Sequence, residues 1–420
     1  MRRTLLTAAV LLVLGAAPAG AASKYVVRGH GNGHGVGLSQ WGAYGYAQHG
    51  LTYDRILRHY YTGTTLGTAA GKQIRVLLQS GRGTISFTGA TRAGSKKLSR
   101  TKTYTARLAF GSIVVRHGDK QVGAFSSPLR IASSRNSLRL GGTALNGVAD
   151  GAYRGALELR PSGGSGLMAI NAVSSDDYVK GVVPGEVPPS WPAEALKAQA
   201  VAARSYGLTT HASTVFDQYP DTRSQVYRGM GSETAPTNAA VDATAGQVVR
   251  YGDRIATTFF FSSSGGHTED VQNSFYGSPS QPYLRGVVDR YDTSAPRHTW
   301  KLTFTKARVQ AKLGSLVKGT FRGIAVVKRG VSPRVVWADV IGSRGRTRVR
   351  GAALRARLGL YDTWATFPSL KKPGGAPAPA AKAAEPPAAA QAPAPATAPP
   401  PAPAESWRWP AATWRARSEP

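Results

Sequence analysis

The sequence contains no cysteine, so disulfide bonds and thiolate metal sites are excluded and the fold must rest on its hydrophobic core. Acidic residues are scarce: 22 Asp and Glu stand against 53 Lys and Arg, a formal net charge of +31. A field of that sign attracts polyanions. Beyond the first residues no stretch is long and apolar enough to span a bilayer, so no transmembrane helix is expected in the mature chain.

The first 22 residues have the pattern of a secretory signal peptide. Arg2 and Arg3 precede an apolar run from Leu5 to Leu14, and small residues follow as far as Ala22. This order predicts cleavage near Ala21 or Ala22 and a secreted, extracytoplasmic protein, with an uncleaved membrane anchor as the alternative. Anionic envelope polymers and lipid headgroups are then nearer partners than nucleic acid, and no nucleic-acid partner is expected.

The composition changes several times along the 420 residues. An alanine- and proline-rich stretch, 368–404, predicts an extended linker that cannot bury a core. The tail after it places Trp407, Trp409 and Trp414 beside arginines, which suits contact with headgroups or envelope polymer, or a disordered end. The predicted divisions are a signal peptide (1–22), a glycine- and histidine-rich segment (23–70), a strand-rich lobe (71–160), a core domain (161–367), the linker (368–404) and the tail (405–420).

One carboxylate, Glu186, lies in apolar surroundings between Val183-Pro184 and Val187-Pro188. Such surroundings disfavour the charged form, which suits a general acid. We predict that Glu186 lies on a rigid loop, followed by a buried alanine-rich helix that Ser190 caps. The alternative is a structural carboxylate that accepts hydrogen bonds from backbone amides at the helix start.

Glycines alternate with other residues from Gly29 to Gly37, which predicts a tight turn that needs unusual backbone angles. A nucleotide-binding loop is a weak alternative, because the spacing departs from the dinucleotide fingerprint. His30 and His34 in this turn suggest either metal ligands or imidazoles bonded to backbone carbonyls. No third ligand is evident nearby, and we predict no metal and no cofactor.

Short β-favouring runs separated by glycine and serine clusters fill residues 74–160, as in successive antiparallel strands. A further strand is predicted at Met168–Val173, a short helix at Glu233–Thr244, and a hairpin across Gly252-Asp253. The predicted class is therefore α+β: a β-rich domain with a strand-rich inserted lobe and a buried alanine-rich helix.

A polar loop follows the predicted hairpin. Its serines lack the flanking glycines of a nucleophile elbow, so a serine hydrolase is poorly supported and binding of sugar hydroxyls is favoured. The candidate binding residues of this loop are Ser262, Ser264, Gly265, Gly266, His267 and Glu269.

Two stretches resemble the SpoIID/LytB family of sporulation lytic transglycosylases and cell-wall amidase enhancers. The run from Asp177-Tyr178 to Arg204 is similar to one family signature, and Gly33 to Ala43 is similar to a second. The resemblance implies that Glu186 is the catalytic acid. It also implies that the second stretch, expected after the catalytic loop, is permuted to the N-terminus. The binding residues that it implies are His34, Ser39, Gln40, Gln225 and Tyr227, together with those of the polar loop described above, residues 262–269, here called the serine-glycine loop.

The resemblance implies a cell-wall protein whose partners are peptidoglycan glycan strands, possible anionic wall polymers and a possible cell-wall amidase. A hydrolytic glycosidase needs two carboxylates, whereas Glu186 alone has convincing surroundings; Asp176 and Asp177 read as solvated or capping residues. A lytic transglycosylase needs one acid that later acts as base, and no activated water. The runner-up is a non-catalytic enhancer of an N-acetylmuramoyl-L-alanine amidase. Some family members hold zinc with cysteines and histidines, but this sequence has no cysteine for such a site.

Overall fold

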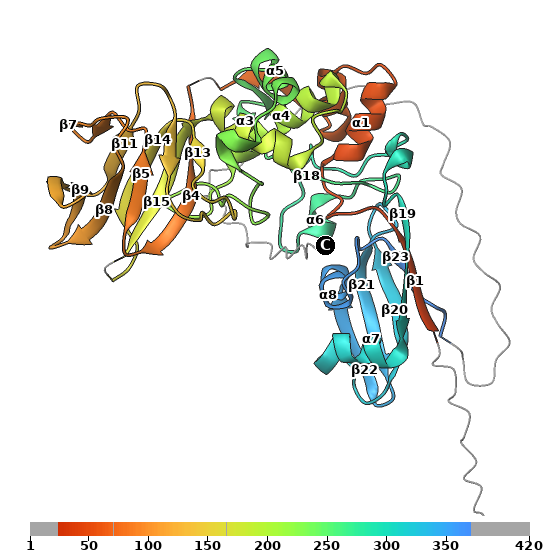
Figure 1. The fold of residues 1–420 in the computed structure, drawn as a ribbon. Coiled ribbons are helices and arrows are strands. Elements are labelled where there is room, and N and C mark those ends of the chain that lie inside the picture. Colours follow the sequence, from red (N-terminus) through yellow and green to blue (C-terminus); the bar gives the residue numbers. More distant parts are fainter. Residues whose placement is uncertain (1–23, 70, 165, 371–420) are drawn as a thin grey trace, which may run out of the picture.

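The computed structural model describes residues 24–69, 71–164 and 166–370 (Figure 1). A strand-rich lobe lies at one end, a group of helices in the middle, and a smaller mixed module at the other end. The predicted β-rich α+β class is confirmed. The predicted signal peptide, most of the linker and the aromatic tail lie outside the described residues.

The lobe consists of two six-stranded antiparallel sheets, and their facing sides bury one hydrophobic core. Along β11, Leu129 and Ile131 are buried while Arg130 is exposed, the alternation expected of a strand with one solvated face. The first sheet contains β5 (Ile85–Thr88), β8 (Tyr104–Ala109), β9 (Ser112–His117), β10 (Lys120–Phe125), β12 (Leu138–Leu140) and β13 (Ala152–Tyr153). The second contains β4 (Gln73–Arg82), β6 (Arg92–Ala93), β7 (Lys96–Lys97), β11 (Leu129–Ala132), β14 (Ala156–Pro161) and β15 (Leu167–Ser174).

The chain leaves the lobe through β15 and enters helix α3 (Ser175–Glu186) directly. The expectation that Glu186 lies on a loop is wrong: it is the last residue of α3, which continues through Pro184. Apolar residues at helical spacing, including Tyr178 and Val182, are fully buried against the lobe core, and this packing outweighs the hydrogen bond that the proline removes. The Ser174 side chain caps the first turn.

Helix α4 (Ala193–Thr209) is buried on nearly every side, as its alanine content predicts. Its N-cap is Pro192, and no side chain caps it, so the predicted Ser190 cap is wrong. Arg204 of α4 is completely buried, and its Nε donates to Asp176 Oδ1 at 2.7 Å. Asp176 at the start of α3 therefore joins the two helices, whereas its neighbour Asp177 accepts a 2.9 Å hydrogen bond from Asn136 of the lobe.

The N-terminal segment divides between two parts of the molecule. Strand β1 (Lys24–His30) pairs with β19 (Thr299–Thr305) and β23 (Ala365–Thr366), whereas α1 (Gln40–Gln48) and α2 (Tyr53–Tyr60) pack on α4. Between them, β2 (Leu38–Ser39) pairs in parallel with β18 (Phe260–Phe261). Gly31, Gly33, Gly35 and Gly37 all have positive φ, which confirms the predicted tight turn.

The remaining elements complete the middle and the C-terminal module. Helix α5 and the hairpin β16–β17 confirm the predictions, although the second hairpin strand is short and the later phenylalanines form β18 instead. In the module, α7 and α8 pack on the β20–β21–β22 sheet and share one core with β1. These elements are β3 (Thr65–Thr68), η1 (Gly229–Ser232), α5 (Ala235–Ala243), β16 (Gln247–Tyr251), β17 (Arg254–Ile255), α6 (Val271–Ser274), η2 (Asp292–Ser294), α7 (Lys306–Leu313), η3 (Gly314–Leu316), β20 (Phe321–Arg329), β21 (Val335–Gly342), β22 (Gly345–Arg350) and α8 (Gly351–Leu358).

Candidate functional site

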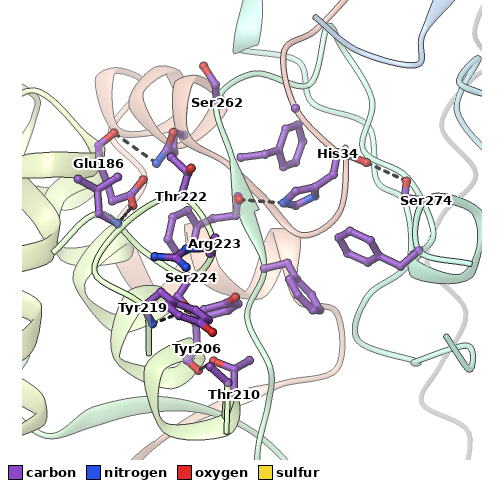
Figure 2. Close-up of a pocket in the computed structure, with 18 of the residues that line it drawn as sticks. His34, Glu186, Tyr206, Thr210, Tyr219, Thr222, Arg223, Ser224, Ser262 and Ser274 are labelled. Atoms are coloured by element: carbon purple, nitrogen blue, oxygen red, sulfur yellow. Dashed lines mark hydrogen bonds between the residues drawn. The ribbon is translucent and has the colours of Figure 1, made fainter. Parts of the chain in front are cut away.

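The carboxyl group of Glu186 opens into a pocket of about 940 Å³ (Figure 2). Its Oε1 accepts a hydrogen bond from the backbone N–H of Val226 at 2.8 Å. Its backbone carbonyl accepts a 3.4 Å bond from the Gln40 side chain, which also contacts Gln199 of α4. The end of α3, the loop after α4 and the start of α1 therefore fix the position of this acid together.

Burial raises the pKa of Glu186, and the hydrogen bond from the Val226 amide opposes that rise only in part. The apolar residue that follows, Val187, is buried in the lobe core, and Trp191 packs on Trp41 with ring centroids 5.1 Å apart. The surroundings that the sequence predicted for this acid are thus present. A carboxyl group in such a place holds its proton at a higher pH than a solvated one.

A second carboxylate, Asp217, also lines the pocket, but it is already engaged. It accepts bonds from the Arg75 backbone N–H and from His211 Nδ1, both at 2.8 Å. Among the described lining residues these are the two carboxylates, and Glu186 is the one for which no ion pair is found. The pocket thus presents one acid available for proton transfer.

Several lining residues were missed by the sequence reasoning. The Arg223 guanidinium lies over the Tyr219 ring, 3.8 Å from its centroid, and Tyr206 lies near by on α4 (Figure 2). Tyr276 and Arg350 also line the pocket, and the Arg350 guanidinium lies over the Tyr276 ring. These residues come from segments far apart in the sequence, so no local pattern marks them; a polar loop with aromatic residues directly after the alanine-rich helix was the one available signal.

Three of the predicted binding residues line the pocket with Glu186: His34, Gln40 and Ser262. Figure 2 shows His34 across the pocket from Glu186. Its ring Nε2 lies 3.0 Å from the Phe260 carbonyl, and its Nδ1 accepts from the Val36 amide. Burial lowers the pKa of His34 to about 3, so this imidazole is neutral at physiological pH. Its contacts join the glycine turn to β18.

The other predicted residues are not part of the pocket lining, and several of them contact protein groups instead. Gln225 donates to the Tyr178 hydroxyl and the Ala203 carbonyl, and the Tyr227 hydroxyl donates to Asn171. Glu269 is buried and accepts from Ser332. The residues that the structure does not bring to the lining are Ser39, Gln225, Tyr227, Ser264, Gly265, Gly266, His267 and Glu269.

No group of three or more histidine, aspartate or glutamate side chains is close enough to hold a metal ion within residues 24–69, 71–164 and 166–370. His30 stacks on Trp364, with ring centroids 4.9 Å apart, and His34 makes the backbone contacts described above. The two histidines of the glycine turn thus have packing roles in this part of the chain.

Comparison with known proteins bears on the segment that carries Glu186. Residues 163–251 match the family model described as "SpoIID: Stage II sporulation protein". Residues 163–251 are therefore similar to the SpoIID family. This SpoIID segment includes β15, α3, α4, α5 and β16, and therefore Glu186 and Asp217. Gln40, Ser262 and Arg350 reach the pocket from outside it.

The curated proteins to which this chain is similar carry two kinds of name. The chain is 43% identical over 141 residues to the "Amidase enhancer" of Bacillus subtilis (strain 168), which covers 33% of this chain and 19% of the relative. It is 30% identical over 210 residues to "Stage II sporulation protein D" of the same organism, covering 46% of this chain and 60% of the relative. A protein of the same name from Bacillus amyloliquefaciens is 29% identical over 212 residues, covering 46% and 59%.

The match thus covers less than two thirds of the length of each of these curated relatives. The names of these relatives fit a cell-wall-related function. In the part of the chain that the structure describes, we find no helix with the length and apolarity needed to cross a membrane.

Two buried aspartates, Asp289 and Asp292, form hydrogen bonds with the backbone of the serine-glycine loop, which follows residues 163–251 in the sequence. Asp292 accepts from the Gly265 amide and lies 3.2 Å from His298 Nδ1. Asp289 is buried among the hydroxyls of Ser264 and Tyr60, and both burial and the charge of Asp292 raise its pKa to about 7. Ionisation of Asp289 therefore works against the folded state.

Asp289→Asn should stabilise the protein at pH 8 but not at pH 4. The folded-state pKa of about 7 exceeds the usual 3.8, so the stability that the neutral acid contributes is present below pH 4 and is lost as the pH rises to 7. We expect a gain on the order of 2–4 kcal/mol in the free energy of unfolding at pH 8, measured by urea denaturation. Asp253→Asn, at an exposed turn, is the control. An identical pH dependence in the wild type and the Asp289 variant would contradict the assignment.

Proposed function

We propose that this chain is an exported lytic transglycosylase that cleaves peptidoglycan glycan strands and leaves 1,6-anhydromuramyl ends, with Glu186 as its catalytic residue. The observation that carries the proposal is the Glu186 carboxyl group: it faces a large pocket, its pKa is raised by burial, and no ion pair with another described residue holds it. The SpoIID match over the same residues supports it.

The reaction needs one group that first gives and then takes a proton. Protonated Glu186 donates to the glycosidic oxygen, and the bond from that oxygen to C1 of the muramic acid breaks. The C6 hydroxyl of the same sugar then attacks C1, and its proton passes to the Glu186 carboxylate. The acid is regenerated and no water is consumed. This route fits a pocket whose second carboxylate, Asp217, is held by His211 and a backbone amide.

The walls of the pocket suit a sugar chain. Tyr206 and Tyr219 place aromatic rings on the lining, and Arg223 covers one face of Tyr219. The Arg223 guanidinium is paired with Asp221 through Nε and Nη2, which leaves Nη1 to donate to a carboxylate of muramic acid or its stem peptide. Gln40 contributes hydrogen-bonding capacity beside the acid while it also holds the Glu186 carbonyl. The net charge of +31 steers the protein toward an anionic wall.

A second candidate function is a non-catalytic protein that binds the wall and enhances an N-acetylmuramoyl-L-alanine amidase. The observation in its favour is the relative named amidase enhancer, which is 43% identical over 141 residues. Both candidates place the protein at the wall, so localisation does not separate them. They differ in whether the purified chain releases anhydro-sugars with no amidase present.

Purified protein should release anhydromuramyl products from glycan strands by itself, and its rate should fall as the pH rises through the pKa of Glu186. The first step requires the protonated acid, and burial moves this fall above the pH at which a solvated glutamate ionises. Mass spectrometry of products from strands with and without stem peptides measures activity and preference. Release only after an amidase is added would favour the enhancer; hydrated reducing ends would indicate hydrolysis instead.

A further inference from the structure

One face of the β20–β21–β22 sheet in the C-terminal module carries a row of arginines that the pocket chemistry does not use. Arg346, Arg348 and Arg350 alternate along β22 and therefore project to the same side. Their cross-strand partners on β21 are Ile341, Asp339 and Trp337. The opposite side packs the module core, which includes Val340 and Val349, against α7 and α8 (Figure 1).

This face is strongly cationic and open to solvent. The side chains of Arg346 and Arg348 are 77% and 53% exposed. Lys328 of β20, the cross-strand partner of Trp337, is exposed on the same side. In the described residues of these three strands, Asp339 is the one carboxylate; it is bonded to Arg348, lies 3.8 Å from Arg346, and has its pKa lowered chiefly by the bond from Arg348. One acid cannot neutralise four cations, so the face keeps an excess positive charge.

The arginine row begins at the pocket. Arg350 lines the pocket, and its guanidinium stacks between the rings of Tyr276 and Trp337, 4.7 Å from the centroid of the latter. Alternate residues on a strand are about 6.7 Å apart. A linear ligand that left the pocket beside Arg350 would therefore meet Arg348 and then Arg346 at regular intervals.

We propose that this sheet face binds a phosphodiester-linked polyol polymer of the cell envelope, which lies along β22 from the pocket rim outward. Such a polymer carries one negative charge in the backbone of each repeat, so successive phosphates can meet successive arginines. Guanidinium groups bind phosphate oxygens in a bidentate fork. The predicted signal peptide favours an envelope polymer over nucleic acid as the source of the phosphates. The proposal is independent of catalysis by Glu186.

The test measures binding of soluble poly(glycerol phosphate) to the full chain at several salt concentrations. The double variant Lys328→Gln/Arg346→Gln removes two exposed charges and leaves Arg348 paired with Asp339 and Arg350 in the pocket. We expect about tenfold weaker binding at low salt and a salt slope smaller by about two. Arg107→Gln/Arg130→Gln removes two exposed charges from the lobe and should change the affinity little.

Equal losses in the two double variants would overturn the proposal, because net charge alone would explain them. Unchanged binding in the Lys328/Arg346 variant would also overturn it. Phosphate-free glycan strands or oligo(dT) that bound as tightly as the polyol phosphate would exclude the assigned ligand. Thermal melting confirms that each variant folds. Cleavage of phosphate-free glycan strands, measured in parallel, separates failure at this face from failure of the proposed activity at Glu186.

Discussion

Glu186→Gln should abolish the release of anhydromuramyl products while leaving binding to purified wall unchanged. Glutamine keeps the size of the side chain and can still accept the 2.8 Å bond from the Val226 amide. It cannot donate a proton to the glycosidic oxygen or take one from the C6 hydroxyl. Because one residue performs both steps, we expect at least about a 10³-fold loss of rate, measured by mass spectrometry of soluble products.

The same substitution should not destabilise the fold at neutral pH. Burial raises the folded-state pKa of Glu186, so the wild type loses stability as the pH rises through that value, and glutamine does not. The variant should therefore be at least as stable as the wild type at pH 8. Glu194→Gln, which changes a half-buried carboxylate on α4 outside the pocket, is the matched control and should keep its activity. Retained activity in the Glu186 variant would remove this residue from the mechanism.

Arg334→Met should have the largest effect on stability. The Arg334 side chain is completely buried and pairs with Asp362 through two bonds of 2.9 Å. It also donates to the carbonyls of His267 at 2.6 Å and Ser264 at 2.8 Å. Removing the cation leaves a buried carboxylate and two carbonyls without these bonds, so we expect a loss of about 3–5 kcal/mol in the free energy of unfolding, measured by urea denaturation.

Two further variants identify the origin of that loss. Arg334→Met/Asp362→Leu removes both charges and should recover much of the stability, because an unpaired buried charge costs more than an absent pair. Arg322→Met, at an exposed position of β20, should change the stability by less than about 0.5 kcal/mol. If the single Arg334 variant lost no more than the Arg322 variant, this ion pair would not be what holds the serine-glycine loop to the C-terminal module.

Local patterns were sufficient for much of the fold. Most of the longer lobe strands, the alanine-rich helix and the glycine turn were predicted, because alternation, composition and glycine conformation act over a few residues; β10 was missed. Short strands such as β6 and β7, which are held by their neighbours in the sheet, were missed. The end of α3 was misread because Pro184 usually ends a helix, whereas here burial of its neighbours against the lobe maintains it.

The candidate site was predictable only in part. The acid itself stood out because its apolar neighbours adjoin it in sequence. Much of the remaining lining did not, because Arg223, Tyr276 and Arg350 reach the pocket from segments far from Glu186 in the sequence. For the serine-glycine loop, in contrast, the sequence predicted more ligand-binding residues than the pocket lining contains. The polar residues of this loop suggested ligand binding, but the structure engages Glu269 and the loop carbonyls with Ser332 and Arg334.

The placement of β1 affects how the chain can assemble. This strand is the first described element, yet both of its sheet neighbours, β19 and β23, belong to the last part of the described chain. The indole of Trp300 donates to the Gly31 carbonyl across 269 positions of sequence. When the polypeptide emerges N-terminus first, β1 therefore has no sheet partner until the residues of β19 and β23 have also emerged. The β19–β1–β23 sheet therefore forms late in folding. A chain that ended before Thr299 would leave both edges of β1 unpaired beside the glycine turn.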